Sequence, residues 1–289
     1  MSSSNAGSGE EIAYVNGEFL PISEATISIE DRGFQFADGV YEVVSTYGGR
    51  PYAMAAHMER LRRSLNEVRI DFDVADLPGV VQQGISRAGF SEALVYLQVT
   101  RGVAPRHHEF PDHKPKPTVV MTVKQLHRPD PVLHETGVAV ITAPDQRWKR
   151  CDIKSIALLP NILAKQLAHE ADAYEALLVD DDDRVTEGSS TSSFRVAGET
   201  VYTSPSGTHI LPSITRAVLI ELIETLGIRL CESFSTVHQY KTADEVFLAG
   251  TTTEAMPVIR VDDVTIGDGT PGPITRRIRQ AFVESVRSR

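Results

Sequence analysis

Cysteine is scarce in this sequence, and long apolar runs are missing. The 289 residues include two cysteines, Cys151 and Cys231, and neither has a neighbour at the spacing of a metal-binding pair. We therefore expect neither a disulfide framework nor a metal site, the zinc sites built on cysteine pairs included. No apolar run has the length that a transmembrane helix needs, so the sequence predicts no membrane-spanning segment.

Basic residues are also in the minority. The chain has 29 Lys and Arg residues against 39 Asp and Glu residues, which gives a formal net charge of −10 at pH 7. This balance argues against a surface that binds nucleic acid or an anionic membrane. An anionic ligand would have to be held by a few residues in a local pocket.

The first eleven residues, MSSSNAGSGEE, are polar and end in two acids. They lack the basic start and the apolar stretch of a signal peptide. We expect residues 1–11 to form a disordered tail on a cytoplasmic protein.

Short strand-like and helical patterns alternate over the rest of the chain, of which 41% is hydrophobic. Asn16-Gly17 and Gly48-Gly49 each separate two apolar arms, a strong hairpin signal. The segment from Met54 to Val68 has apolar residues at helical spacing. The sequence therefore predicts a mixed α/β fold.

The stretch HRPDPV, residues 127–132, is the best candidate for a domain boundary, because its two prolines interrupt both neighbours. We expect a smaller N-terminal domain over 12–126, a linker over 127–132 and a larger C-terminal domain over 133–289. In the larger domain, one predicted helix contains Leu163, Leu167, Ala171 and Tyr174. A second, ended by Gly227, has an apolar face made of Ile214, Val218, Leu222 and Leu226. Four aspartates at 180–183 favour a solvated turn over a metal site.

Lys154 is an amine among apolar neighbours, between Ile153 and Ser155. By itself it is most simply a surface charge. Burial would lower its pKa and let the neutral amine form a Schiff base with a carbonyl cofactor. That hypothesis requires a place for such a cofactor.

Two segments could hold the phosphate of a cofactor. The sequence SIT at 213–215 opens a predicted helix, whose free N–H groups and dipole attract anions. The sequence GTTTE at 250–254 places a glycine and three hydroxyls after a strand, and Arg60 could add a positive charge. The alternatives are a simple helix cap, a capped turn and an exposed arginine.

Glu187 lies at the end of a predicted strand, before the small hydroxyl residues of EGSSTSS. A surface carboxylate at a turn is the simplest interpretation. A buried one could keep a pyridine nitrogen protonated, which makes the ring an electron acceptor in amino-acid chemistry.

Together these residues resemble the class IV, or fold-type IV, pyridoxal-phosphate aminotransferases, and within them the D-amino-acid aminotransferases. The likeness extends from about Tyr14 to Val286. Its most specific stretches are EDRGFQFADGVYEVV, QVTRGVAPRHHEFP, RWKRCDIKSIALL, AKQLAHEADAYEALL, VTEGSSTSSF and SITR.

The resemblance implies a two-domain fold, with a small α/β domain and a larger barrel-like domain with helices that binds pyridoxal 5'-phosphate. It implies that Lys154 is the catalytic, Schiff-base lysine and that Glu187 is the partner of the pyridine nitrogen. It also implies that Leu211 lies against the ring face. The phosphate would be bound by Arg60, the backbone amides of Ile214 and Thr215, and Thr251.

The resemblance further implies that the substrate α-carboxylate is bound by Tyr41, Arg106 and His108, the last two on a loop from the partner subunit of a homodimer. An arginine suits this function because its planar fork holds a carboxylate by two hydrogen bonds. His107, between them, is not expected to be a ligand. The implied reaction is ping-pong transfer of an amino group from a D-amino acid to a 2-oxo acid such as 2-oxoglutarate or pyruvate.

Two positions depart from the family pattern. Phe34 stands where tyrosine is usual, which would alter a pocket wall, and Gly250 replaces a serine, which removes one hydroxyl from the phosphate site. The alternatives of the same fold are a branched-chain L-amino-acid aminotransferase, an (R)-amine transaminase and an aminodeoxychorismate lyase. A non-catalytic cofactor-binding protein is a further alternative, but it would not need both Lys154 and Glu187.

Overall fold

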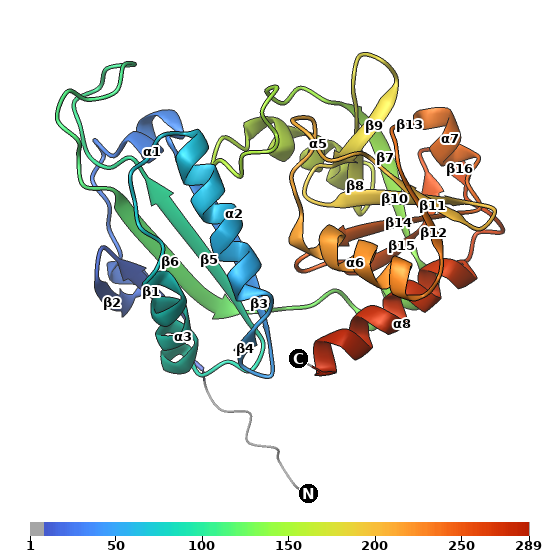
Figure 1. Cartoon of the computed structure of the whole chain (residues 1–289), viewed down its shortest axis with the longest axis horizontal. Coiled ribbons are helices and arrows are strands. Elements are labelled where there is room, and N and C mark those ends of the chain that lie inside the picture. Colours follow the sequence, from blue (N-terminus) through green and yellow to red (C-terminus); the bar gives the residue numbers. More distant parts are fainter. Residues whose placement is uncertain (1–8, 289) are drawn as a thin grey trace, which may run out of the picture. The chain divides into compact units, whose positions relative to one another are not determined.

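The computed structural model of the chain describes residues 9–288. The chain folds into two compact units (Figure 1). The N-terminal unit contains the chain up to His127 together with Ile153–Ala157, and the C-terminal unit contains Arg128–Asp152 and the chain from Leu158 onward.

The N-terminal unit is built on one antiparallel sheet with the strand order β2-β1-β6-β5-β3-β4. Its strands are β1 (Ile12–Val15), β2 (Glu18–Pro21), β3 (Gly39–Tyr47), β4 (Arg50–Pro51), β5 (Ala93–Thr100) and β6 (Thr118–Gln125). Its helices are η1 (Ile22–Glu24), α1 (Arg32–Phe36), α2 (Met54–Glu67) and α3 (Leu77–Ala88).

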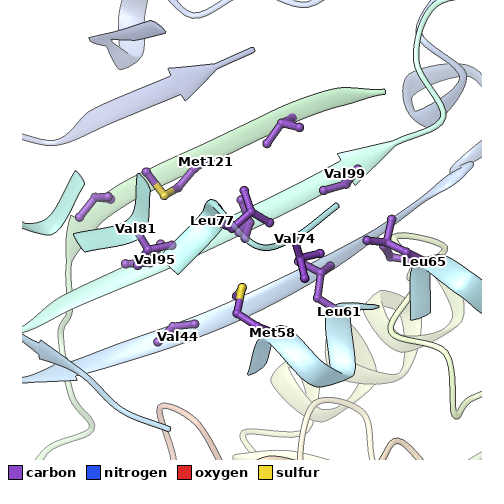
Figure 2. Packing of buried hydrophobic residues seen from close by; sticks show 14 of the residues in the cluster. Val44, Met58, Leu61, Leu65, Val74, Leu77, Val81, Val95, Val99 and Met121 are labelled. Atoms are coloured by element: carbon purple, nitrogen blue, oxygen red, sulfur yellow. The ribbon is translucent and has the colours of Figure 1, made fainter. Parts of the chain in front are cut away.

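One face of this sheet is covered by α2 and α3, which form a single core with it. Figure 2 shows Met58, Leu61 and Leu65 of α2 pointing toward the strands. Leu61 and Leu65 are almost completely buried. Since a fully buried leucine contributes roughly 1.5–3 kcal/mol relative to an exposed one, this face supplies much of the stability of the unit.

Strand β3 presents different residues on its two faces, because successive side chains of a strand point in opposite directions. Val40, Glu42 and Val44 are fully buried, whereas Tyr41 and Val43 on the other face are only half-buried. Glu42 is thus a carboxylate that points into the apolar face under α2.

The C-terminal unit contains a larger sheet with the order β12-β11-β10-β14-β15-β7-β8-β9-β13, and β16 pairs with β15. Its strands are β7 (Val138–Pro144), β8 (Glu175–Val179), β9 (Arg184–Gly188), β10 (Ser192–Ala197), β11 (Thr200–Thr203), β12 (Arg229–Glu232), β13 (Ser235–Thr236), β14 (Glu245–Gly250), β15 (Glu254–Val261) and β16 (Val264–Thr265). Its helices are α4 (Pro131–Thr136), α5 (Leu159–Glu170), α6 (Ile214–Thr225), α7 (Val237–Lys241) and α8 (Pro273–Ser288).

This sheet curls back on itself. Its two end strands are consecutive in the chain, since β12 ends at Glu232 and β13 begins at Ser235. A link this short spans only about 10 Å, so the two ends of the sheet lie near each other, as in a barrel. The predicted mixed α/β fold with a barrel-like C-terminal part is confirmed.

The local predictions also agree with the structure. Asn16-Gly17 joins β1 to β2, Gly48-Gly49 joins β3 to β4, and α2 covers the predicted helix. All four turn residues have positive φ, which the predicted turn type requires.

The division into units differs from the predicted domains in two respects. Ile153–Ala157 belongs to the N-terminal unit, because Ser155 bridges to Val40 and the Ile156 N–H donates to the Gly39 carbonyl. The predicted linker at 127–132 overlaps α4, which begins at Pro131. Of the expected disordered tail, residues 1–8 lie outside the described part, while the N–H of Glu10 donates to the Ala88 carbonyl.

The predicted apolar face of α6 needs correction, and α5 ends at Glu170, before the predicted helix residues Ala171 and Tyr174. In α5 the small residues Ala164 and Ala168 are buried, whereas Leu163 and Leu167 are 53% and 49% exposed. In α6 the buried apolar residues are Val218, Leu219 and Ile223, so the face is rotated from the predicted one. Periodicity shows that a helix has an apolar face, but not which neighbour covers it. Within residues 9–288 no helix is long and apolar enough to cross a membrane.

Candidate active site

Lys154 is fixed by its backbone between β3 and α2. Its carbonyl accepts from the Tyr41 N–H at 3.0 Å, and its own N–H donates to Ser64 Oγ at 3.3 Å. Its Nζ lies 4.3 Å from the centre of the Tyr41 ring. The structure therefore brings together the predicted nucleophile and one residue predicted to bind the substrate.

Arg60 lies on α2 and is paired with the buried Glu42. Its Nε and Nη2 donate to the two oxygens of Glu42 at 2.8 and 2.7 Å. His57, one turn earlier on α2, has Nδ1 at 2.7 Å from the same carboxylate. Glu42 thus fixes the direction of the Arg60 guanidinium, as a phosphate-binding arginine would require.

The electrostatics of this cluster follow from burial and charge. Burial alone would raise the pKa of Glu42, but the hydrogen bonds and charges of Arg60 and His57 outweigh it and lower the pKa from 4.5 to about 2. Burial lowers the pKa of His57, and the positive charges of Arg60 and Lys154 lower it further, although Glu42 opposes this. We therefore assign a neutral His57 that donates Nδ1–H to Glu42 near pH 7.

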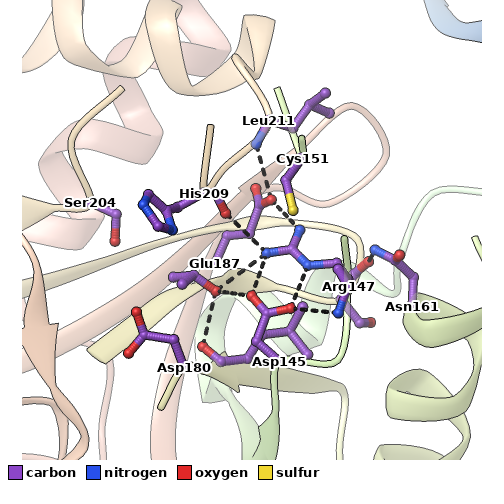
Figure 3. A network of polar contacts seen from close by, with 12 residues as sticks. Asp145, Arg147, Cys151, Asn161, Asp180, Glu187, Ser204, His209 and Leu211 are labelled. Atoms are coloured by element: carbon purple, nitrogen blue, oxygen red, sulfur yellow. Dashed lines mark hydrogen bonds and ion pairs between the residues drawn. The ribbon is translucent and has the colours of Figure 1, made fainter. Parts of the chain in front are cut away.

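Glu187, at the end of β9, is the carboxylate of a buried network in the C-terminal unit (Figure 3). Its Oε1 accepts from Arg147 Nη1 at 2.5 Å and from the Leu211 N–H at 3.0 Å. Both hydrogen bonds go to the same oxygen, which leaves Oε2 for a further donor. Burial raises the pKa of the Glu187 carboxyl, and Arg147 and the Leu211 N–H oppose that rise.

Arg147 is in turn held by Asp145, directly after β7, and by the segment between β11 and α6. Asp145 accepts from its Nε and Nη2 at 2.9 and 2.8 Å, and the His209 carbonyl accepts from Nη2 at 3.2 Å. Thr186 Oγ1 donates to Asp145 at 2.7 Å. Glu187 is therefore placed by an ordered set of charged partners, which suits a carboxylate that holds a ring nitrogen proton.

The serine-rich loop after Glu187 is organised by a second buried carboxylate, Glu175 of β8. It accepts hydrogen bonds from the hydroxyls of Ser189, Ser190 and Thr191. Gly188 permits this close packing, since a Cβ there would lie 2.2 Å from Thr191 Oγ1. The hydroxyl residues of EGSST thus face an acid of their own chain.

The predicted phosphate-binding groups of the C-terminal unit have suitable local geometry. Ser213 caps α6 and accepts from the Arg216 N–H at 3.2 Å, which leaves the first two helical N–H groups, those of Ile214 and Thr215, for a ligand. Thr251 is half-buried in the turn between β14 and β15. A Cβ at Gly250 would lie at least 3.4 Å from its neighbours, which is an ordinary contact distance. The structure therefore has room for a serine side chain here, and steric crowding does not explain the glycine.

Arg106 and His108 lie on the loop between β5 and β6, and the ring of Phe36 is next to both. The Arg106 guanidinium carbon lies 4.9 Å from the ring centre, and the His108 ring packs edge-on at 5.6 Å. The structure thus brings these two predicted carboxylate ligands together. The side chain of Phe34 is 69% exposed in the described chain, and its expected place on a pocket wall stays a prediction.

The predicted residues divide between the units. Lys154, Arg60, Tyr41, Arg106 and His108 belong to the N-terminal unit, and Glu187, Leu211, Ile214, Thr215 and Thr251 belong to the C-terminal unit. Their assembly into one pocket stays a prediction. Among residues 9–288 no cluster of His, Cys, Asp or Glu has the arrangement of a metal site.

The family model described as amino-transferase class IV matches residues 39–261. The chain belongs to the class IV aminotransferases. The predicted family and aminotransferase activity are confirmed.

Relatives within this family are similar over nearly their whole length. The D-alanine aminotransferase of Staphylococcus haemolyticus is 39% identical over 278 residues, covering 96% of this chain and 98% of the relative. That of Bacillus licheniformis is 40% identical over 275 residues, covering 94% and 96%.

Solved structures of the family have the same fold. The branched-chain amino acid aminotransferase of T.th. with pyridoxamine 5'-phosphate has a TM-score of 0.88 at 27% identity, covering 97% of this chain and 95% of that chain. The branched-chain enzyme of Escherichia coli also has a TM-score of 0.88, at 24% identity, covering 96% and 94%. The second likeness concerns the fold alone.

Sequence reasoning missed three charged residues that hold predicted residues or loops in place: Glu42 in the N-terminal unit, and Arg147 and Glu175 in the C-terminal unit. Each partners a residue or loop that was predicted, but from a distant or unremarked position. Glu42 follows Tyr41 directly and could have been found as a lone acid among the apolar residues of VYEVV. No comparable signal marks Arg147, which lies in a segment with other basic residues.

Glu42 provides a pH-dependent test of the N-terminal cluster. Because its pKa is lowered in the folded state, its contribution to stability is present above its unfolded pKa and is lost as the pH falls from 4.5 toward 2. We expect Glu42→Gln to lower the free energy of unfolding by about 3 kcal/mol at pH 7, and the gap to the wild type to narrow below pH 4.5. Urea unfolding of the cofactor-free protein across this pH range measures both.

Glu59→Gln is the matched control, since Glu59 lies on the same helix with 72% of its side chain exposed. It should change the unfolding free energy little at any pH. A gap for Glu42→Gln that does not vary with pH would show that the charge of Glu42 contributes nothing and that only packing was lost.

Proposed function

We propose that this chain is a pyridoxal-phosphate-dependent transaminase that moves the amino group of D-amino acids, of the D-alanine or D-glutamate type, to 2-oxo acids such as 2-oxoglutarate or pyruvate. The observation that carries the substrate class is the pair Arg106 and His108, both packed on Phe36. Two neighbouring nitrogen-rich side chains on an exposed loop suit the binding of a carboxylate. The D-alanine aminotransferases that are about 39% identical over almost the whole chain support the same choice.

The structure has groups that fit pyridoxal 5'-phosphate. Glu187 is a buried carboxylate with one oxygen free for a ring N–H, and the Ile214 and Thr215 amides with the Thr251 hydroxyl can bind a phosphate. When bound, the cofactor supplies a carbonyl that takes up the amino group and a ring that accepts the electron pair released at the substrate Cα.

The residues of the chain supply the remaining chemistry. Lys154 provides the amine and moves the proton at the substrate Cα. Glu187, held by Arg147, keeps the proton on the ring nitrogen, and Leu211 lies against the ring face. Arg60, directed by Glu42, adds positive charge to the phosphate site.

Tyr41, Arg106 and His108 orient the substrate by its carboxylate. Lys154 acts from one fixed side, so the hydrogen on Cα must point toward that side. The position of the carboxylate then decides which enantiomer reacts. We place the carboxylate on the side that suits D-amino acids.

A homodimer in the cytoplasm is part of this proposal, with Arg106 and His108 contributed to the site of the partner chain. A row of exposed apolar side chains along α5, made of Leu159, Ile162, Leu163 and Leu167, supports association, since a contiguous apolar patch commonly marks an interaction surface. In the N-terminal unit Ile29 is 78% exposed, and in the C-terminal unit Leu159 and Ile162 are 66% and 59% exposed.

A branched-chain L-amino-acid transaminase is the second candidate, because branched-chain enzymes are among the most similar solved structures. A panel of paired D- and L-amino acids with one (R)-amine, and 2-oxoglutarate as acceptor, decides between the two. A preference for L-leucine over every D-amino acid would assign the chain to the branched-chain group.

Lys154→Ala tests the nucleophile. We expect this variant to fold, to lose the visible absorption of the bound cofactor and to lose transamination by several orders of magnitude, because one residue provides both amine and proton transfer. Lys149→Ala, an exposed lysine of the same segment, is the control and should behave like the wild type. Near-normal turnover by Lys154→Ala would refute the assignment.

Glu187→Gln tests the partner of the ring nitrogen. Removal of the negative charge should slow the spectral change of the first half-reaction with excess D-alanine, while cofactor binding through the phosphate largely survives. Stopped-flow absorbance measures the rate. An unchanged rate would mean that Glu187 has a different function.

Arg106→Ala tests recognition of the carboxylate. We expect a higher KM for D-alanine and D-glutamate and a loss of about 2–4 kcal/mol of transition-state binding, as for a charged hydrogen-bonded pair broken on one side. An (R)-amine without a carboxylate should lose much less. His107→Ala, between the two proposed ligands, is the matched control and should retain the activity on D-alanine. Equal losses on D-alanine and on the amine would contradict carboxylate binding by Arg106.

A further inference from the structure

The loop that carries Arg106 and His108 is closed tightly at its base. It leaves β5 at Arg101 and joins β6 at Thr118. Gly102 has φ +97°, and a Cβ there would lie 2.1 Å from the Lys116 carbonyl oxygen. The two ends of the loop therefore touch, and a loop of this kind depends on side chains to fix its tip.

Arg32 supplies that fixation from the start of α1. It is 3% exposed, and its Nη1 and Nη2 donate to the carbonyl oxygens of His107 and His108 at 2.6 and 3.4 Å. Its Nε donates to Asp38 at 2.8 Å. A planar guanidinium held on three sides defines both the position and the direction of the backbone that it binds.

Phe36, at the other end of α1, completes the support. Arg32 and Phe36 are four residues apart and share a face of the helix. The Arg32 guanidinium carbon lies 4.9 Å from the Phe36 ring centre, the same distance as that of Arg106, and His108 contacts this ring as well. The backbone and both side chains of the proposed carboxylate site thus rest on α1.

Asp38 joins Arg32 to a second buried arginine. Arg101 donates to it through Nε and Nη2 at 2.8 and 2.9 Å, and the Arg101 guanidinium lies 3.8 Å from the centre of the Phe110 ring. Phe110 belongs to the same loop, beyond His108. The loop is therefore held on both sides of its functional residues by one Arg–Asp–Arg group.

We propose that Arg32 is a positioning residue that sets the specificity of this transaminase for substrates with a carboxylate. Through the carbonyls of His107 and His108 it holds Arg106 and His108 in the orientation that binds the substrate, without contacting the substrate itself. This inference rests on the proposed function of Arg106 and His108. The further claim is that carboxylate binding by Arg106 and His108 depends on Arg32, a buried residue outside the loop.

Arg32→Lys is the informative substitution, because lysine keeps the positive charge but cannot bind Asp38 and two carbonyls with one planar fork. In the holoenzyme we expect kcat/KM for D-alanine to fall about 10- to 100-fold, mainly through KM, as for a misplaced binding group. The (R)-amine should change little. In a background of Arg106→Ala and His108→Ala, Arg32→Lys should cause no further loss of kcat/KM for D-alanine. If Arg32 only supported the fold, Arg32→Lys would lower the activity further in this background as well.

Hydrogen exchange gives a readout that does not depend on turnover. The backbone amides of Ala104 and of residues 106–110 should exchange faster in Arg32→Lys, with the rest of the chain unchanged. Arg195→Lys is the matched control, a buried arginine that donates to Ser235 in the C-terminal unit. It should alter neither the exchange of the loop nor the ratio of D-alanine to amine activity.

The outcomes distinguish a failure of the proposed function from a failure of the proposed positioning by Arg32. If Arg106→Ala leaves the activity on D-alanine intact, the loop does not bind the carboxylate, and the proposed function and this inference are both wrong. If Arg106→Ala impairs D-alanine turnover but Arg32→Lys does not, only the positioning function of Arg32 is wrong. Equal losses on D-alanine and the amine in Arg32→Lys, with faster exchange throughout the unit, would show that Arg32 supports the fold alone.

Discussion

The buried ion pair between Glu187 and Arg147 is the interaction on which the candidate site depends. A carboxylate out of water costs several kcal/mol unless cations and N–H groups face it, and removal of one partner of such a pair typically costs about 3–5 kcal/mol. Arg147 and the Leu211 N–H meet this requirement at one oxygen of Glu187. Asp145 then fixes Arg147, so the C-terminal ends of β7 and β9 are held in one arrangement. The other oxygen of Glu187 accepts neither of these hydrogen bonds, as the proposed contact with a ring nitrogen requires.

The same constraint recurs in the N-terminal unit. Glu42 holds Arg60, and Asp38 holds Arg32 and Arg101. In each case an acid with little exposure, 0% for the Glu42 side chain and 12% for that of Asp38, sets the direction of a planar guanidinium, which a flexible lysine could not reproduce. The arginines then act on other groups, the proposed phosphate in one case and the carbonyls of the substrate loop in the other. Charge burial thus provides orientation as well as stability.

Successive side chains of β3 point to opposite faces of the sheet, and this places Glu42 and Tyr41 on different faces. Glu42 points to the face covered by α2 and pairs with Arg60, whereas Tyr41 points to the opposite face and lies beside Lys154. Two adjacent residues of one strand therefore contact Arg60, proposed to bind a phosphate, and Lys154, the proposed nucleophile. The backbone of Lys154 is fixed by the same strand through the Tyr41 N–H, although Lys154 lies more than a hundred residues further along the chain. The backbone of β3 thus fixes the position of Lys154.

The sequence by itself determined what depends on neighbouring residues. Asn16-Gly17 and Gly48-Gly49 predicted their hairpins because turn geometry is a local property of the backbone. Six short stretches spread between Tyr14 and Val286, those around Lys154 and Glu187 among them, were sufficient to predict the family. Only the tertiary structure decided the partners of these residues, since Arg147 lies 40 positions from Glu187 and Arg32 lies 75 from the carbonyl of His107. It also decided which face of α5 is buried: Ala164 and Ala168 pack inside while Leu163 and Leu167 stay exposed. The spacing of apolar residues in a sequence shows that a helix has an apolar face. Which face is buried depends on the elements that the fold packs against the helix.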